Sequence, residues 1–131
     1  MTETDMVVSF INKKNIFAVV GASNNSTKYG YKVFMDLKNN GYDVYPVNLK
    51  EKKIKDYDCY SSLKTLPIKP DVVITIVPSR ITKEIVKQAS ELNINKIWMQ
   101  PGSESNKAIS YCKKNNMDVI SNQCVIINKL K

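Results

Sequence analysis

The sequence predicts one α/β domain of the Rossmann type, in which a parallel sheet of five strands is covered by helices on both faces. Three observations support this fold. The chain has 131 residues, the usual size of a single domain. Apolar runs of strand length alternate with amphipathic stretches of about a dozen residues, as in β–α–β units. The first apolar run stops at Gly21, and a helical pattern resumes at Tyr29 after a small polar turn.

The N-terminal elements are a helix and a buried strand. Residues 3–11 have the apolar spacing of a short amphipathic helix, which Thr2 or Thr4 can cap. We expect this segment, residues 1–12, to pack on the rest of the domain. Residues 16–20 are a continuous apolar run, which is typical of a parallel strand buried on both faces.

The next helix and strand follow the polar turn. An apolar face within residues 33–37 predicts a helix that ends at Gly41, where a left-handed C-cap forms easily. Residues 43–47 are the second strand. Pro46 lies near its end, which suits a strand terminus better than a central position.

The middle of the chain begins with a polar stretch and ends with a strand and a helix. Residues 50–70 are irregular, with a short helical turn around residues 61–66. Residues 71–77 are the clearest strand in the chain, and Pro78 stops it. The serine that follows caps a helix whose apolar face extends over residues 81–92.

The last elements repeat the alternation. Residues 96–99 form a fourth strand, and a helix that opens at residues 103–104 has its inner face within residues 108–112. Residues 118–120 form a fifth strand, followed by a short tail through Cys124.

We expect the strand order 3-2-1-4-5, with strands counted along the chain. Ligands of such sheets bind beyond the carboxyl ends of the strands, where the order reverses. The loops at that edge are residues 21–28, 47–53, 77–80 and 100–103.

The turn after the first strand suits an anion but matches no complete motif. The G-x-G-x-x-G pattern is absent, and the P-loop pattern fails because no second glycine precedes a Lys-Ser/Thr pair. Gly21, Ala22, Ser23 and Gly30 nevertheless keep the backbone accessible, and the next helix directs its N–H groups toward the turn. The turn predicts a nucleotide-like ligand. The alternative is that Gly21 only makes a tight turn.

The end of the second strand narrows the ligand class. An NAD-binding domain has an acidic residue there to hold the ribose hydroxyls. This chain has Asn48 and Lys50, and Glu51 is followed by Lys52 and Lys53. An amide and a lysine favour a ligand with an additional phosphate, such as NADP or coenzyme A (CoA). The alternative is that Lys50 is an ordinary solvated lysine.

Composition argues against several other classes, although a basic protein associated with RNA or DNA is a third possibility. The net charge is +8, but all basic residues except Arg80 are lysines spread along the chain, which disfavours nucleic-acid recognition. Cys59, Cys112 and Cys124 are far apart and no histidine accompanies them, so we expect reduced thiols and no metal site. No apolar run approaches the roughly 20 residues that span a bilayer, and the N-terminus does not resemble a signal peptide, so we expect a cytoplasmic protein.

Seven segments match one family in the same order along the chain. They are Ala18-Val-Val-Gly-Ala-Ser23, Lys28-Tyr-Gly30, Val33-Phe34, Tyr45-Pro-Val-Asn48, Val77-Pro78, Trp98-Met-Gln-Pro-Gly102 and Cys124. On these segments the chain resembles the small stand-alone CoA-binding proteins, which are related to the CoA-binding domain of the succinyl-CoA synthetase α subunit.

The resemblance implies that CoA, or an acyl-CoA, lies across the carboxyl edge of the sheet. The residues implied to bind it are Gly21, Ala22, Ser23 and Asn24 at the pyrophosphate or pantetheine, Lys28, Tyr29 and Gly30 beside them, Asn48 and Lys50 at the adenosine phosphate, Ile76, Val77 and Pro78 on the other wall, and Gln100, Pro101 and Gly102 near the thiol end.

The resemblance also bears on chemistry. The synthetase relatives work through a phosphorylated histidine on a segment beyond the CoA domain, and this chain has no histidine. We expect a non-catalytic CoA-binding module that acts as a sensor, carrier or subunit, with a homodimer or a partner protein left open. The alternatives are an NAD(P)-dependent oxidoreductase fragment and the CoA-binding subunit of a split acyl-CoA synthetase. For Cys124, where the family often has cysteine, a structural role is expected and thiol exchange with CoA is the alternative.

Overall fold

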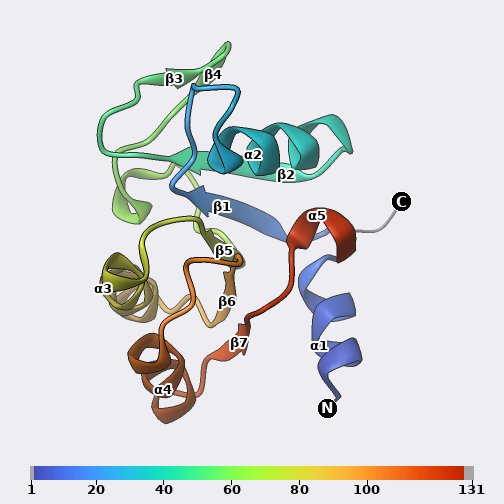
Figure 1. Ribbon diagram of the computed structural model, residues 1–131, viewed down its shortest axis with the longest axis vertical. Helices are drawn as coiled ribbons and strands as arrows, with labels where there is room; N and C mark the ends of the chain where they lie inside the picture. Colours follow the sequence, from blue (N-terminus) through green and yellow to red (C-terminus); the bar gives the residue numbers. More distant parts are fainter. Residues whose placement is uncertain (1, 129–131) are drawn as a thin grey trace.

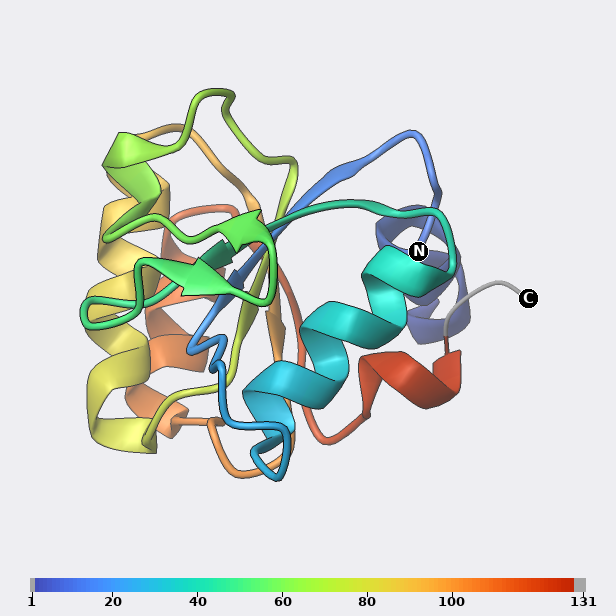
Figure 2. The same ribbon diagram turned by 90° about the horizontal axis from the view of Figure 1, so that it is seen from above.

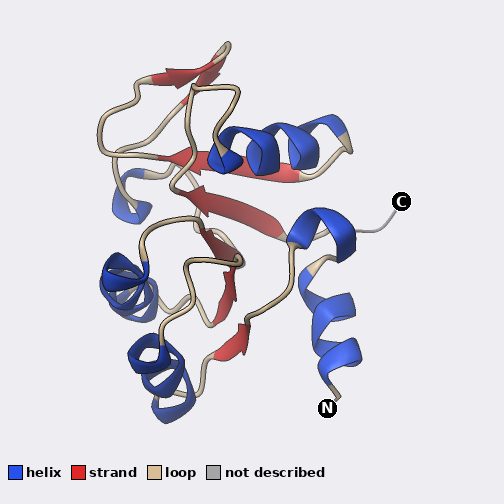
Figure 3. Cartoon of the chain, in the orientation of Figure 1, coloured by secondary structure: helices blue, strands red, loops and turns tan. Residues whose placement is uncertain are grey.

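The computed structural model describes residues 2–128, which form a five-stranded parallel sheet between two layers of helices (Figure 1 and Figure 3). The strands of this sheet are β1 (Ile16–Val20), β2 (Asp43–Val47), β5 (Val72–Thr75), β6 (Lys96–Met99) and β7 (Asp118–Ile120). The helices are α1 (Glu3–Phe10), α2 (Tyr29–Asn39), α3 (Ser79–Glu91), α4 (Asn106–Lys114) and α5 (Val125–Asn128). A small hairpin, β3 (Lys53–Ile54) and β4 (Tyr57–Asp58), and a 3₁₀ turn, η1 (Leu63–Thr65), lie between β2 and β5. The predicted α/β class is confirmed.

The strand order differs from the one predicted. The sheet runs β2-β1-β5-β6-β7, which is 2-1-3-4-5 along the chain, whereas the sequence analysis predicted 3-2-1-4-5. All four residues of β5 are buried, so this strand needs neighbours on both sides and pairs with β1 and β6. In β2, Asp43 is exposed and Pro46 has no N–H to donate, so this strand suits the edge of the sheet.

Two hydrophobic clusters lie on opposite faces of the sheet. Along β1, Phe17 and Val19 point to the cluster that includes residues of α1, α2 and α5, while Ala18 and Val20 point to the cluster under α3 and α4. Figure 1 shows the same two groups of helices on either side of the strands. The run of apolar residues in β1 thus follows from burial on both faces.

The two ends of the described chain pack together on one face. Thr2 and Asp5 form a capping box that starts α1, in agreement with the predicted cap. Phe10 of α1 meets the Trp98 ring edge-on at 6.2 Å between centroids. The Trp98 indole N–H donates to the carbonyl of Gln123 at 2.8 Å, which holds the segment leading into α5. The tail expected through Cys124 leads into the short helix α5.

The segment after β2 is more ordered than the sequence predicted. Tyr60 donates its N–H to the Pro46 carbonyl at 3.0 Å and accepts from the Asn48 N–H at 2.9 Å, so it lies along the outer edge of β2. In the hairpin, Tyr57 packs edge-on against Phe34 of α2 at 5.5 Å between centroids. These contacts fix residues 48–60 beside β2 and α2.

No helix within residues 2–128 combines the length and apolar character that a membrane span requires.

Candidate ligand-binding site

The strand order places a crevice at the carboxyl edge of the sheet. The connection after β1 leads to β2 at one side, and the connection after β5 leads through α3 to β6 at the other. Such a reversal leaves an opening between the two loops, here residues 21–28 and 76–78. The order predicted from the sequence would have placed this opening beside residues 100–102 instead. In the observed order β1 has β5 and not β6 as its neighbour, so the opening lies between the loops that follow β1 and β5.

Two glycines allow the segments around the crevice to approach each other. Gly21 has φ +101°, and a Cβ on it would lie 2.0 Å from the carbonyl oxygen of Ile76. A Cβ on Gly30, in the first turn of α2, would lie 2.0 Å from the carbonyl oxygen of Gly21. Backbone packing alone therefore requires both glycines, which agrees with the tight-turn interpretation of Gly21. The same packing brings the start of α2 to the end of β1.

The helices that begin at the crevice have no side-chain caps. The N-cap positions of α2 and α3 are Lys28 and Pro78, and neither side chain bonds the first turn. By contrast, Thr2 caps α1 and Ser105 caps α4. In the first turn of α3 the Ile81 N–H donates to the Pro78 carbonyl at 2.8 Å. The other first-turn N–H groups of α2 and α3 have no side-chain cap and can meet an external acceptor, and the helix dipoles favour a negative one.

Three adjoining cavities follow this edge of the sheet. The central cavity, of about 410 Å³, is lined by Gly21, Ser23, Lys28, Tyr29, Gly30, Asn48, Ile76, Val77 and Pro78. It shares Tyr29 and residues 76–78 with a cavity of about 280 Å³ that reaches Pro101, Gly102 and Ser103. On the other side it shares Gly21, Asn48 and Val77 with a cavity of about 360 Å³ between the end of β2, η1 and α3. We call this last one the α3 cavity.

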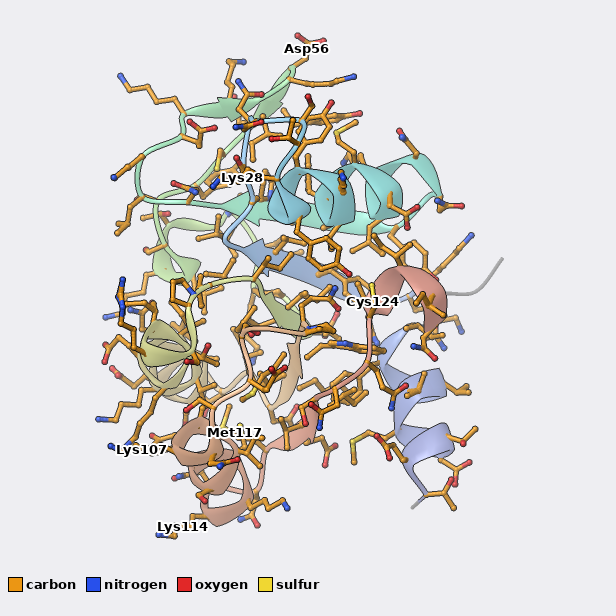
Figure 4. All side chains as sticks on the ribbon, viewed as in Figure 1. Lys28, Asp56, Lys107, Lys114, Met117 and Cys124 are labelled. Atoms are coloured by element: carbon orange, nitrogen blue, oxygen red, sulfur yellow. The ribbon has the colours of Figure 1, made fainter. Side chains whose placement is uncertain are left out.

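The rim of these cavities is cationic. Lys28 lines the central cavity beside the first turn of α2, and Lys50 lines the α3 cavity (Figure 4 labels Lys28). Both side chains are exposed, and the ion pair of Lys53 with Asp58 involves neither of them. In the same part of the chain, no three histidine, cysteine or acidic side chains gather to hold a metal ion. The rim suits an anionic ligand.

Asn48 serves first as a brace between two loops. Its Nδ2 donates to the Ala22 carbonyl at 2.8 Å, and its Oδ1 accepts from the Lys50 N–H at 2.8 Å and the Glu51 N–H at 3.4 Å. Ala22, predicted to contact a ligand, has its side chain in the hydrophobic core. The residues expected at the phosphate turn and at the adenosine phosphate are therefore tied to each other.

Asn24 faces the hairpin side of the turn and lines none of the three cavities. Its N–H donates to the carboxylate of Glu51 at 2.6 Å, and its Oδ1 accepts from the Lys55 N–H at 3.0 Å. This N–H already has an anionic partner. The observed contacts of Asn24 join the turn to residues 51–55. The predicted contact of Asn24 with a ligand remains an expectation.

Gln100 is fully buried and links three segments rather than lining a cavity. Its Oε1 accepts from the Val125 N–H at 2.7 Å, and its Nε2 donates to the Tyr29 hydroxyl at 3.2 Å and the Cys124 sulfur at 3.4 Å. Tyr29 and Cys124 also share a short hydrogen bond of 2.5 Å. Figure 4 shows Cys124 in the segment that leads into α5.

This network shifts the pKa values of two groups in opposite directions. Burial, and then the hydrogen bond with Cys124, raise the pKa of the Tyr29 hydroxyl to about 12. Burial also acts against ionisation of the Cys124 thiol, but hydrogen bonds from Tyr29, Gln100 and the backbone of Ile126 and Ile127 outweigh it and lower its pKa. Cys124 is therefore a more acidic thiol than an ordinary cysteine.

The loop after β6 is held by buried hydroxyl groups. The Ser103 hydroxyl lies 2.8 Å from the hydroxyl of Thr75 in β5, and the Thr82 hydroxyl of α3 donates to the Ser103 carbonyl at 2.6 Å. All three side chains are buried. Pro101 and Gly102, which precede Ser103, are exposed and line the smaller cavity. Ser103 thus belongs to the support of the loop, and α4 begins three residues later.

Sequence reasoning missed most of the α3 cavity. Its walls include Ser61, Ser62 and Leu63 at η1, together with Ile81, Ile85 and Gln88 on one face of α3. The two isoleucines were predicted, but as core residues of the helix. The sequence held one sign of this cavity: Gln88 lies on the same face of α3 as the two isoleucines, where a fully packed helix would have an apolar residue.

Comparison with known proteins gives a consistent result. The family of CoA-binding domains matches residues 15–129. The α subunit of acetate–CoA ligase (ADP-forming) II from Pyrococcus furiosus is 31% identical over 92% of this chain and 28% of its own length. Acetate–CoA ligase (ADP-forming) II from Archaeoglobus fulgidus is 35% identical over 59% of this chain and 12% of its own. This chain therefore spans less than a third of each of these relatives.

Two solved structures are similar over nearly their whole length. A conserved hypothetical protein from Pyrococcus furiosus is 33% identical, with a TM-score of 0.84, over 88% of this chain and 99% of that one. A hypothetical protein from Pyrococcus horikoshii is 27% identical, with a TM-score of 0.91, over 97% and 89%.

Proposed function

The chain belongs to the family of CoA-binding domains, and we propose that it binds CoA or an acyl-CoA along the carboxyl edge of its sheet. The observation that carries this proposal is the row of three cavities, which joins an apolar compartment, the turn after β1 and a smaller cavity at residues 101–103. CoA has the same sequence of parts: an adenosine, a diphosphate and a pantetheine arm.

Each part of CoA has a matching compartment. The diphosphate would lie at Gly21 and Ser23, against the uncapped start of α2 and beside Lys28. The adenosine would enter the α3 cavity, with its 3′-phosphate toward Lys50 on the rim. The pantetheine arm would run past Tyr29 toward Pro101 and the thiol end of the site.

We infer that the domain binds CoA without transforming it. The sequence contains no histidine, so it has no imidazole to carry a phosphoryl group or to activate a nucleophile. Cys124 is a more acidic thiol than an ordinary cysteine, but neither the Gln100 amide, which donates to its sulfur, nor the Tyr29 hydroxyl, which shares a hydrogen bond with it, supplies a general base. A role as sensor, carrier or subunit fits these residues.

The test is a binding measurement with four ligands: CoA, 3′-dephospho-CoA, NADP and NAD. CoA should raise the melting temperature, since a ligand at about 100 times its Kd stabilises the folded state by about 2.7 kcal/mol. Lys50→Glu should weaken CoA on the order of tenfold and dephospho-CoA much less, because the reversed charge opposes the 3′-phosphate. Lys113→Glu, an equal change at an exposed position of α4, is the control. Stabilisation by NADP and none by millimolar CoA would overturn the assignment.

A second candidate is the CoA-binding subunit of a split acyl-CoA synthetase. The similarity to a ligase α subunit from Pyrococcus furiosus favours it. The test is to purify the tagged chain from its native host and ask whether an ATP-binding polypeptide accompanies it. The complex should then form acyl-CoA from a carboxylic acid, CoA and ATP. A chain that purifies alone and still binds CoA would favour the sensor or carrier role.

A further inference from the structure

The face of α3 that lines the α3 cavity is apolar except for one glutamine, Gln88. Ile81, Ile85 and Gln88 follow the i, i+4, i+7 spacing that places side chains on one stripe of a helix. The opposite wall includes Val47 and Leu63, both buried. The helical pattern and the apolar walls would predict an apolar residue at position 88, but this position is a glutamine.

The Gln88 amide has no partner in the described chain. The residue is half-buried, and within residues 2–128 no group bonds its side chain. Its amide atoms are still reached by solvent in the open cavity. A ligand that displaces this solvent has to offer the amide a hydrogen-bonding partner. The other side-chain amide of the cavity, Asn48, is already held by its hydrogen bonds with Ala22, Lys50 and Glu51. Gln88 is therefore the amide that a ligand in this cavity can meet.

The position of Gln88 selects the part of the ligand that it meets. Gly21 and Val77 join the α3 cavity to the turn after β1, and Ile81 stands in the first turn of α3 next to them. Gln88 follows Ile81 by seven residues, which places the two residues about 10 Å apart along the helix axis. Figure 2 shows the C-terminal half of α3, which includes Gln88, beside η1. Gln88 thus lies at the end of the cavity away from the phosphates, where the base of a nucleotide would be.

We propose that Gln88 hydrogen-bonds the edge of an adenine base in the α3 cavity and makes the site selective for adenine. This inference rests on the proposed CoA binding. A glutamine amide offers one acceptor and one pair of donors, which matches the amino group of adenine and the ring nitrogen beside it. Leu63 and Ile85 supply apolar surface for the faces of the base.

The test is a double-mutant-type thermodynamic cycle: binding affinity is compared with and without the Gln88 amide and with and without the amino group of the base. The ligands are CoA and a CoA analogue with purine in place of adenine, which lacks the 6-amino group. Native protein should bind the analogue about five- to tenfold more weakly, the value of one lost hydrogen bond. Gln88→Leu completes the apolar stripe and should keep the fold, yet it should bind both ligands with equal affinity.

Two further variants make the result specific. Gln88→Ala leaves the cavity open, so equal affinity for both ligands in this variant excludes blockage by the leucine side chain. Lys87→Leu, on the exposed side of the same helix, should preserve the preference for CoA over the analogue. If the preference survives in both Gln88 variants, the adenine contact is wrong while CoA binding stands. If native protein binds neither ligand, the proposed function falls with it.

Discussion

Replacing Gly21 with alanine should destabilise the fold much more than the same change at Gly102, although both glycines have a left-handed backbone. At Gly21, φ is +101° and a Cβ would lie 2.0 Å from the carbonyl oxygen of Ile76. At Gly102, φ is +95° and no atom lies within 4 Å of the added Cβ. The pair therefore separates backbone strain from collision.

The magnitudes follow from these two terms. A non-glycine residue in this region costs about 1–3 kcal/mol, and the reduced entropy of the unfolded chain offsets about 0.4–1 kcal/mol. We expect Gly102→Ala to lower the free energy of unfolding by about 1 kcal/mol. Collision with backbone adds about 1–3 kcal/mol, so Gly21→Ala should lower it by about 3 kcal/mol. Gly30→Ala has the collision without the strain, and about 2 kcal/mol is expected.

Urea unfolding followed by circular dichroism measures these differences. Equal losses at Gly21 and Gly102, within about 0.5 kcal/mol, would refute the packing argument. The result also decides how the site can be tested. A variant at Gly21 reports on the fold before it reports on a phosphate, whereas Gly102→Ala leaves the packing intact and reports on the loop that lines the smaller cavity.

Three further predictions concern the thiols and the loop after β6. Cys124 should react with iodoacetamide faster than Cys112, and at a pH below the ordinary thiol pKa of 9.0, because hydrogen bonds lower its pKa whereas burial raises that of Cys112 to about 11. Tyr29→Phe removes one of these hydrogen bonds, so the labelling profile of Cys124, read by mass spectrometry, should move to higher pH. An unmoved profile would mean that the hydroxyl does not stabilise the thiolate. Ser103→Ala should lower the free energy of unfolding by about 1–3 kcal/mol, because the Thr75 hydroxyl loses a buried partner; an unchanged urea midpoint would contradict this.

Local patterns predicted the elements, while their lateral order depended on long-range contacts. Each predicted strand is present, since burial on both faces leaves an apolar run in the sequence. The order failed because β2 was placed inside the sheet. Asp43 and Pro46 already argued for an edge, since a charge and a missing N–H both suit a strand with one neighbour.

The helix starts show the limit of short motifs. Ser79 and Ser103 both precede apolar patterns and were expected to open helices. Ser79 instead lies inside α3 after Pro78, and the Ser103 hydroxyl bonds Thr75 while Ser105 caps α4. A serine before a helix can bond the first turn or the neighbouring strand, and only the tertiary packing selects between them.

The candidate site was predictable at the turn and less so around it. The cavities include most of the expected residues, from Gly21 and Lys28 to Val77 and Gly102. Ala22 and Gln100 point into the protein instead, because the residues next to a turn alternate between the core and the crevice. The α3 cavity was missed because it depends on η1 lying beside α3. Gln88 interrupts the apolar stripe of α3 in the sequence, but it does not indicate which segment faces that stripe.

The outer edge of β2 has a consequence for how copies of the chain can associate. Main-chain groups at Pro46 and Asn48 are already occupied by Tyr60, and Asp43 adds a charge at the other end of the strand. At the carboxyl end of β2 the sheet margin therefore offers a foreign strand no free main-chain groups, which disfavours fibre-like stacking there. Complexes that use this end of the margin must be built from side-chain surfaces.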